Sequence, residues 1–219
     1  MPAAVIFDLD GVLIDSEQVW NDARRQLTEE SGGAWREDAQ RAMMGMSSLE
    51  WSRYMREQLN VPMSPQEIST AVVERLERLY REHLPLLPGA RESVTSLAAR
   101  WPLALATSAN RRIIALVLAL SGLGDCFQAT VSSEEVARGK PAPDVYEHAA
   151  HRLACPPASC AAVEDSTNGI RAAASAGMFV VAIPNRAFPP EPTALARATL
   201  VLSSLESLTA TAVAALDRP

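Results

Sequence analysis

The two aspartates Asp8 and Asp10 are the strongest candidates for catalysis in this sequence. They follow an apolar run, Ala3-Ala4-Val5-Ile6-Phe7, which is typical of a strand buried on both faces of a parallel sheet. Because residues i and i+2 of an extended chain point the same way, both carboxylates can face one point beyond the strand. Two such carboxylates repel each other unless a cation or a proton lies between them. The pair therefore suits metal-assisted acid and base chemistry, although Asp8-Leu9-Asp10-Gly11 alone is as typical of a solvated turn.

Residues suited to an anion follow a second predicted strand. This strand, Leu103–Thr107, runs into a helix through small and polar residues, Thr107, Ser108, Ala109 and Asn110. Hydroxyl groups and the free amides of a helix N-terminus together form an anion site. Taken alone, the same residues indicate an ordinary N-cap at Ser108 or Asn110. The only lysine of the chain, Lys140, lies in a later loop and can reach inward, although a solvated loop lysine is the simpler interpretation.

Two more acids, Glu164 and Asp165, follow a further predicted strand, Ala161–Glu164, where helix capping is the simpler interpretation. Because ligands of doubly wound sheets bind beyond the carboxyl ends of the strands, we expect these acids to lie near Asp8 and Asp10. Carboxylate oxygens suit Mg²⁺, which binds through one or two carboxylates and a substrate phosphate. Hydroxyl and ammonium donors opposite the cation suit a phosphoryl group. Together these residues predict a metal-assisted phosphoryl-transfer site.

The elements that must position these side chains begin with a helical stretch after the first strand. Its predicted helices are Glu17–Glu30, Arg36–Met44, Ser48–Leu59 and Pro65–Glu82. The last has a capping box, Ser64 with Glu67, and Pro65 at its first position. We therefore predict a small α-helical cap domain of residues 16–85, inserted after the first strand and joined to it by two hinges.

From Pro88 onward, helices alternate with short apolar strands. Strands are predicted at Leu103–Thr107, Thr130–Ser132, Ala161–Glu164, Phe179–Ile183 and Leu200–Leu202, and helices at Ala90–Arg100, Arg111–Leu120, Asp144–Leu153, Asn168–Ala176 and Leu205–Leu216. Alternating elements with short connections predict an α/β fold with a doubly wound parallel sheet. The predicted core domain comprises residues 1–15 and 86–219.

Composition restricts the partners of the chain. The 219 residues carry a net charge of −6, which argues against nucleic acid, and no basic run suggests an anionic membrane. Three cysteines without CxxC spacing indicate neither a disulfide framework nor a zinc site, so a reducing cytoplasm fits best. We expect no signal peptide or membrane anchor. No heptad pattern favours a coiled coil, so a monomer is favoured and the oligomeric state stays open.

The motifs resemble a known family. The stretches Asp8-Leu9-Asp10-Gly11-Val12, Thr107-Ser108, Lys140-Pro141 and Glu164-Asp165-Ser166 are similar, in this order, to the four motifs of the haloacid dehalogenase superfamily. The helical insert resembles the branch that contains small-molecule phosphatases and β-phosphoglucomutase. The runs GKPAPDVY and EDSTNGIRAAASAGM also look like that branch, so the resemblance spans nearly the whole chain and implies a Rossmann-like core.

The resemblance implies roles for individual residues. The substrate would be a small phosphorylated metabolite, such as a sugar phosphate, and the cofactor Mg²⁺. Asp8 would be the nucleophile, and Asp10 the general acid and base. Mg²⁺ would be held by Asp8, the Asp10 backbone carbonyl and Asp165, and less directly by Glu164. The phosphoryl group would be bound by Thr107, Ser108, Ala109, Asn110 and Lys140, of which Thr107 and Lys140 would also be catalytic.

The tryptophan and methionine residues of the insert have two interpretations. Packing within the insert is favoured, because apolar residues at helical spacing usually form a core. If any of them reach the substrate, we expect Trp20 next to the first hinge, and Met46 in the turn Gly45-Met46-Ser47-Ser48.

Other activities are compatible with parts of this pattern. A dehalogenase has no use for the additional acids, and a signalling receiver domain lacks the helical insert. A phosphomutase needs a cation in its lid to bind a distal phosphate. The related β-phosphoglucomutase has an Arg where this chain has Ser48, and a His where this chain has Trp20. The nearest basic residue, Arg53, is expected to face solvent. The sequence therefore favours hydrolysis over mutase activity.

Overall fold

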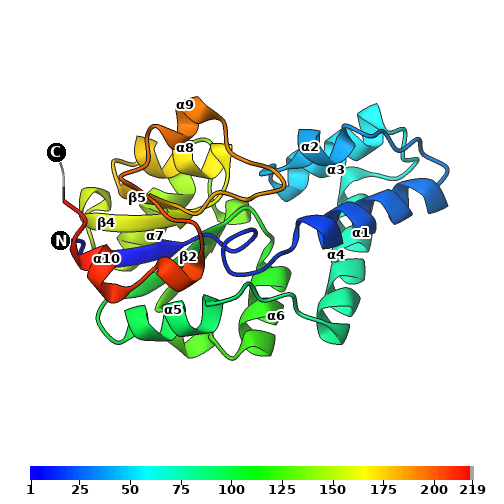
Figure 1. Ribbon diagram of the computed structural model, residues 1–219. Coiled ribbons are helices and arrows are strands. Elements are labelled where there is room, and N and C mark those ends of the chain that lie inside the picture. Colours follow the sequence, from blue (N-terminus) through cyan, green and yellow to red (C-terminus); the bar gives the residue numbers. More distant parts are fainter. Residues whose placement is uncertain (218–219) are drawn as a thin grey trace.

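The computed structural model describes residues 1–217 and is built around a six-stranded parallel sheet (Figure 1). Its spatial strand order is β3-β2-β1-β4-β5-β6, so β1 is flanked by β2 and β4. This order confirms the predicted doubly wound α/β fold. The strands are β1 (Ala4–Phe7), β2 (Leu103–Thr107), β3 (Ala129–Ser132), β4 (Cys160–Glu164), β5 (Phe179–Ala182) and β6 (Leu200–Val201).

Helices cover both faces of the sheet, so every residue of β1 is buried. Val5 and Phe7 belong to a buried cluster on the face covered by α5 (Ala90–Ala98) and α6 (Arg111–Ser121). Ala4 and Ile6 belong to a second cluster on the opposite face. That face is covered by α7 (Asp144–Arg152), α8 (Thr167–Ser175) and α9 (Pro192–Leu195). Burial on two sides explains why the strand is apolar throughout instead of alternating.

Four helices after β1 lie beside the sheet and form most of the right side of Figure 1. Their buried tryptophan, methionine and leucine residues join the same apolar cluster as Val5 and Phe7. The predicted capping box is present, since Ser64 N–H donates to Glu67 Oε2 at 2.8 Å and Glu67 N–H donates to Ser64 Oγ. The helices are α1 (Glu17–Glu30), α2 (Ala39–Met43), α3 (Ser48–Gln58) and α4 (Pro65–Glu82).

The two linkers of this helical segment run side by side. Asp15 N–H donates to Pro85 O at 2.8 Å, and Leu87 N–H donates to Leu13 O at 3.0 Å. The division into a core of residues 1–15 and 86–219 and a cap of residues 16–85 stays a prediction, which these paired linkers support. We use "cap" below for α1 to α4.

The predicted helix Leu205–Leu216 is wrong, because the structure has two shorter pieces there. A 3₁₀ turn, Leu205–Ser207, is followed by α10 (Ala210–Ala214). Thr209 separates them, since its hydroxyl oxygen accepts the Ala212 N–H at 3.1 Å and so starts a new helix. Helix α2 is also shorter than predicted, and α9 was not predicted. Further 3₁₀ turns lie at Gly124–Cys126, Ser133–Glu135 and Pro157–Ser159.

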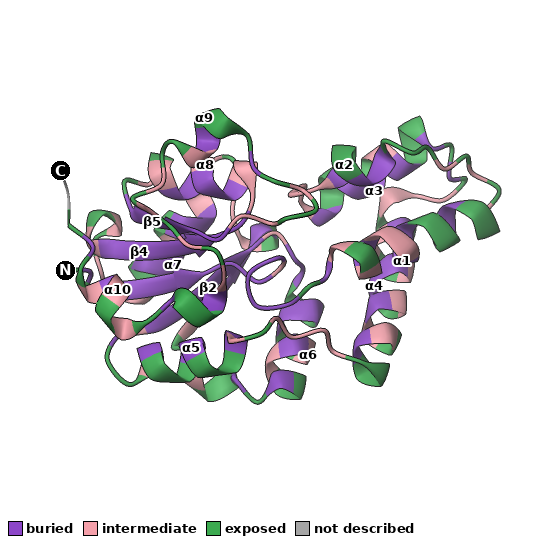
Figure 2. Ribbon diagram, in the orientation of Figure 1, coloured by how far each residue is buried: buried purple, intermediate pink, exposed green. Residues whose placement is uncertain are grey.

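Buried residues are concentrated in the strands and on the inward faces of the helices (Figure 2). The exposed large apolar side chains are scattered singly, at Met1, Leu49, Leu120 and Val201. Within residues 1–217, no helix combines the length and the apolar character that a membrane span requires.

The buried apolar side chains of the cap should contribute most of what the cap adds to the free energy of unfolding. Leu76 on α4 is fully buried, whereas Leu49 on α3 is 54% exposed. We expect Leu76→Ala to lower the free energy of unfolding by about 2–5 kcal/mol, because it removes buried methyl groups and leaves a cavity. The matched variant Leu49→Ala should change it by less than about 0.5 kcal/mol. Urea unfolding followed by circular dichroism measures both, and equal effects would contradict the assigned packing.

Candidate active site

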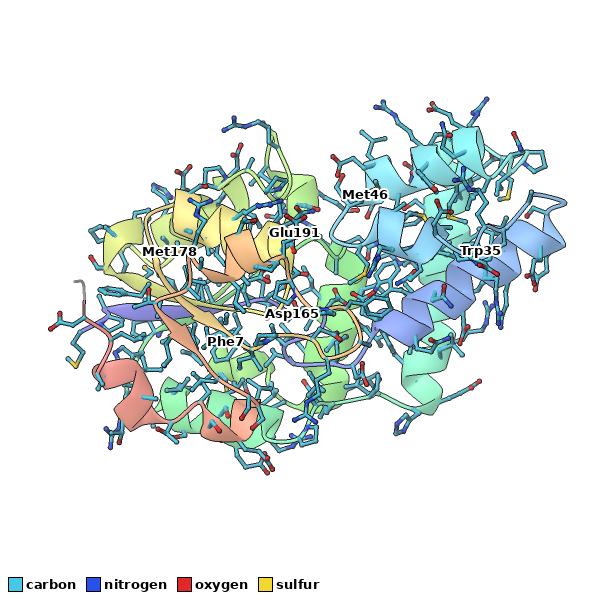
Figure 3. The ribbon with its side chains drawn as sticks, turned by 45° about the horizontal axis from the view of Figure 1, so that its top comes forward. Phe7, Trp35, Met46, Asp165, Met178 and Glu191 are labelled. Carbon is cyan, nitrogen blue, oxygen red and sulfur yellow. The ribbon has the colours of Figure 1, made fainter. Side chains whose placement is uncertain are left out.

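The carboxyl ends of β1, β2 and β4 bring the predicted site residues to one edge of the sheet. Asp8 follows β1, Thr107 ends β2, and Glu164 ends β4. Strands β2 and β3 lie on one side of β1, and β4 to β6 lie on the other, so the strand order reverses between β1 and β4. Sheets of this topology bind ligands at such a point. A cavity of about 490 Å³ lies there, lined by Asp8, Thr107 and Asp165 at the strand ends and by the cap. Figure 3 shows Asp165 on the sheet side and Met46 on the cap side.

Lys140 is buried between two of the carboxylates. Its Nζ lies 2.6 Å from Glu164 Oε1 and 2.9 Å from Asp8 Oδ1, and 5.0 Å from the centre of the Tyr146 ring. Burial lowers the pKa of Lys140, but the attraction of Asp8 and Glu164 outweighs it and raises the pKa above its usual value. The only lysine of the chain is therefore an inward-facing ammonium. A planar guanidinium would not replace it without rearrangement of this narrow site.

Glu164 is held by protein donors at both of its oxygens. Oε1 accepts from Lys140 Nζ and from the Tyr146 hydroxyl at 2.7 Å. Oε2 accepts from the backbone N–H groups of Asp165 and Ser166 at 3.0 and 3.2 Å, and from the Ser166 hydroxyl at 3.1 Å. The carboxylate therefore fixes the loop after β4 and the position of Lys140 together.

Asp8 and Asp165 are buried carboxylates without such complete coordination. Burial raises the pKa of Asp8 to about 7, with Lys140 opposing the shift and Glu164 adding to it. Burial, followed by the charges of Glu164 and Asp8, raises the pKa of Asp165 as well. Among the described residues 1–217, the buried Oδ1 of Asp165 has no hydrogen-bond partner. Such an oxygen, close to a second carboxylate, is a suitable ligand for a hard divalent cation.

A metal ion fits this set of donors. One carboxylate oxygen from each of Asp8, Glu164 and Asp165 lies within 4.8 Å of the others. Protein donors occupy both oxygens of Glu164, so Asp8 and Asp165 are the better ligands. A divalent cation would also lower the free energy of keeping these like charges together.

Two glycines, Gly11 and Gly169, allow the backbone to approach the acids closely. Gly11 has a φ of +77°, and a Cβ there would lie 2.1 Å from Asp165 Oδ2. A Cβ at Gly169 would lie 1.8 Å from Glu164 Oε1. Neither the turn at Gly11 nor the first turn of α8, which contains Gly169, can carry a side chain at these positions without moving a carboxylate.

Asp10 is oriented by the start of the cap. Its Oδ1 accepts hydrogen bonds from Ser16 Oγ at 2.5 Å and from Trp20 Nε1 at 2.9 Å. Its other oxygen, Oδ2, receives neither of these hydrogen bonds. Trp20 also lines the cavity and belongs to the apolar cluster, so it combines packing with a polar contact to Asp10.

The residues after β2 have two different roles: some line the cavity, and one is the N-cap of helix α6. Thr107, Ser108 and Ala109 line the cavity, and the Ala109 N–H donates to Thr107 Oγ1 at 3.1 Å. Asn110 is not among the lining residues. Its Oδ1 accepts the Ile113 N–H at 3.1 Å and caps α6, which is the simpler of the two interpretations of its side chain.

The cap side of the cavity contains a cation that the sequence analysis missed. Met46 lines the cavity and also packs against the apolar cluster, so both of its interpretations stay open, whereas Arg53 is exposed, as expected. Arg24 and the exposed Arg41 are also lining residues, and Arg24 is only 5% exposed. A signal was present, because Glu17, Trp20 and Arg24 recur at the spacing of one helix face. That face of α1 points into the cavity.

Comparisons with known proteins agree with this geometry. A family model described as haloacid dehalogenase-like hydrolase matches residues 2–177. The chain is 36% identical over 207 residues to the probable pseudouridine-5'-phosphatase of Drosophila melanogaster, covering 91% of this chain and 88% of that protein. It is 35% identical over 213 residues to hexitol phosphatase B of Escherichia coli K12, covering 94% of each. The structure of CbbY from Rhodobacter sphaeroides in complex with phosphate is similar with a TM-score of 0.85 and 29% identity, covering 95% of this chain and 96% of that one. The chain therefore belongs to the haloacid dehalogenase-like hydrolases.

Proposed function

We propose that this chain is a Mg²⁺-dependent phosphatase that hydrolyses a small phosphomonoester through an aspartyl-phosphate on Asp8. One observation carries the proposal: the buried Asp8 carboxylate faces the cavity beside Lys140 and beside the unpartnered oxygen of Asp165. The names of the relatives support it, since a pseudouridine-5'-phosphatase and a hexitol phosphatase both act on phosphorylated small molecules.

In the first step an Asp8 oxygen attacks phosphorus, and the bond from phosphorus to the leaving oxygen breaks. Lys140 favours the ionised form of Asp8 that this attack requires. Asp10 gives its proton to the leaving oxygen. The two hydrogen bonds on Oδ1 orient its carboxyl group and leave Oδ2 as the oxygen that carries this proton.

In the second step Asp10, now a carboxylate, accepts a proton from a water molecule that attacks phosphorus. The bond from phosphorus to Asp8 breaks, which releases inorganic phosphate and restores both carboxyl groups. Thr107, Ser108 and Lys140 donate hydrogen bonds to the phosphoryl oxygens, where negative charge concentrates in each transition state. Removing one such donor typically lowers kcat by about 10²–10³-fold.

Mg²⁺ would be held by the Asp8 carboxylate, the Asp10 backbone carbonyl and Asp165. When bound, the cation neutralises charge on the phosphoryl group and on the surrounding acids. Glu164 contributes less directly, because its role is to hold Lys140 and the loop after β4.

Replacement of the nucleophile tests the central claim. We expect Asp8→Asn to abolish steady-state release of phosphate from p-nitrophenyl phosphate, because an amide cannot form the acyl phosphate. The nearly isosteric change should leave the circular dichroism spectrum unaltered. Asp125→Asn, at an exposed turn away from the cavity, is the matched control and should retain full activity. Sustained hydrolysis by folded Asp8→Asn protein would remove Asp8 from this role.

Removal of the cation tests the metal site. We expect EDTA to abolish phosphate release, and Mg²⁺ added in excess to restore it, because Asp8 and Asp165 are buried together and require a cation between them. The Asp165→Asn variant should need a higher Mg²⁺ concentration for half-maximal activity. Full activity in chelator would exclude the proposed metal dependence.

A phosphomutase is the second candidate, and Arg24 is the observation that favours it, because a cap cation could bind a distal phosphate. We nevertheless expect the phosphoryl group to pass to water. The assay supplies β-glucose 1-phosphate with catalytic glucose 1,6-bisphosphate and follows glucose 6-phosphate and free phosphate separately. Efficient formation of glucose 6-phosphate without release of phosphate would overturn the assignment as a hydrolase.

A further inference from the structure

Arg24 is a buried cation at the cap side of the cavity. Its guanidinium carbon lies 4.6 Å from the centre of the Trp20 ring and 5.1 Å from that of the Trp51 ring. The two rings are 6.0 Å apart and meet edge to face. Within residues 1–217, no ion pair shorter than 4.0 Å involves Arg24. The aromatic rings therefore hold the guanidinium in place while its charge lacks a direct partner.

The hydrogen-bond donors of Arg24 are not all used. Nε is buried without a partner, and Nη1 makes a long contact of 3.4 Å with Gln40 Oε1. Burial lowers the pKa of Arg24 to about 10, with Glu17 and Asp10 opposing the shift, so it stays charged at neutral pH. Leaving a buried charged donor unpaired is unfavourable. Arg24 lines the cavity, so a ligand bound there can supply an acceptor to the donors of its guanidinium that face the cavity.

A carboxylate lies on the same wall of the cavity. Glu17 lies about two helical turns before Arg24 on the same face of α1. It lines the cavity and accepts a hydrogen bond from Gln40 Nε2 at 2.7 Å. Burial, followed by the charge of Asp10, raises the pKa of Glu17. A second anionic group on the substrate would meet Arg24 and the exposed Arg41, but also the carboxylates of Glu17 and Asp10. A hydroxyl group can instead accept from Arg24 and donate to Glu17.

We infer that Glu17 and Arg24 form the subsite for the leaving group, and that this group is uncharged and carries several hydroxyls. The substrate class is then the phosphates of sugars and sugar alcohols, rather than bisphosphates or phosphorylated carboxylic acids. The inference rests on the proposed function and deepens it, because it names the substrate class of the same site. Trp20 connects the leaving-group subsite to the phosphoryl end of the cavity, since it contacts Arg24 on one side and Asp10 on the other.

Binding to protein that carries Asp8→Asn tests the subsite without turnover. Isothermal titration calorimetry in Mg²⁺ compares sorbitol 6-phosphate with methyl phosphate, which lacks the hydroxyls. Adding Arg24→Met should weaken binding of sorbitol 6-phosphate at least about tenfold and that of methyl phosphate less than about threefold, the loss expected for a hydrogen bond to a charged group. Arg25→Met is the matched control, because the neighbouring Arg25 is exposed and pairs with Asp22, and it should change neither affinity.

Two further, more conservative variants test the subsite with less risk of unfolding the protein. Arg24→Lys retains the charge but not the planar fork, and should also lower the affinity for sorbitol 6-phosphate relative to methyl phosphate. Glu17→Gln should weaken sorbitol 6-phosphate and strengthen fructose 1,6-bisphosphate, because it removes a negative charge from the wall. A thermal melt of each variant shows that it is folded.

The outcomes separate this inference from the proposed function. Equal effects of Arg24→Met on both ligands, in a folded protein, would overturn the subsite while leaving the phosphatase intact. Tighter binding of fructose 1,6-bisphosphate or phosphoglycolate than of sorbitol 6-phosphate, dependent on Arg24, would overturn the uncharged class. Failure of the wild-type protein to hydrolyse any phosphomonoester would contradict the proposed function. The binding data would still decide whether Glu17 and Arg24 bind the hydroxyl groups of the ligand.

Discussion

Three carboxylates lie close together at the end of the sheet, where water has little access. Transfer of a single ion of this kind out of water still costs several kcal/mol after the protein relaxes, and like charges raise that cost further. Lys140 is the group that makes the arrangement possible, because one ammonium contacts both Asp8 and Glu164. The strand order, which sets β1 beside β4, and the absence of side chains at Gly11 and Gly169 follow from the same requirement.

The cap contributes to the chemistry as well as to the enclosure of the cavity. Trp20 connects the apolar cluster to Asp10, so the orientation of the Asp10 carboxylate depends on the packing of α1. Other contacts hold the cap against the sheet side, including the Ser108 hydroxyl with Gly45 O and the paired hydrogen bonds of Arg112 with Glu77. The orientation of Asp10 and the enclosure of the cavity therefore depend on the same helix.

Much of the fold could be predicted because local patterns determine it. The apolar strands, the capping box at Ser64 and the acids at strand ends all depend on residues close together in the sequence. The break at Thr209 was missed, since a side-chain cap there competes with a pattern that also suits one continuous helix. Arg24 was missed for another reason: its burial depends on Trp51, a residue of a different helix, and a lone arginine on a helix usually faces solvent.

The pairing of the two linkers has a consequence for how such a protein can change. The chain leaves the core at Leu13 and returns at Leu87, where the two backbones are hydrogen-bonded to each other. Whatever lies between these points is closed at its base, so its length and its helices can vary without stretching the sheet or shifting Asp8. The cap can therefore be exchanged without disturbing β1, provided that Ser16 and Trp20, which hold the Asp10 carboxylate, are kept.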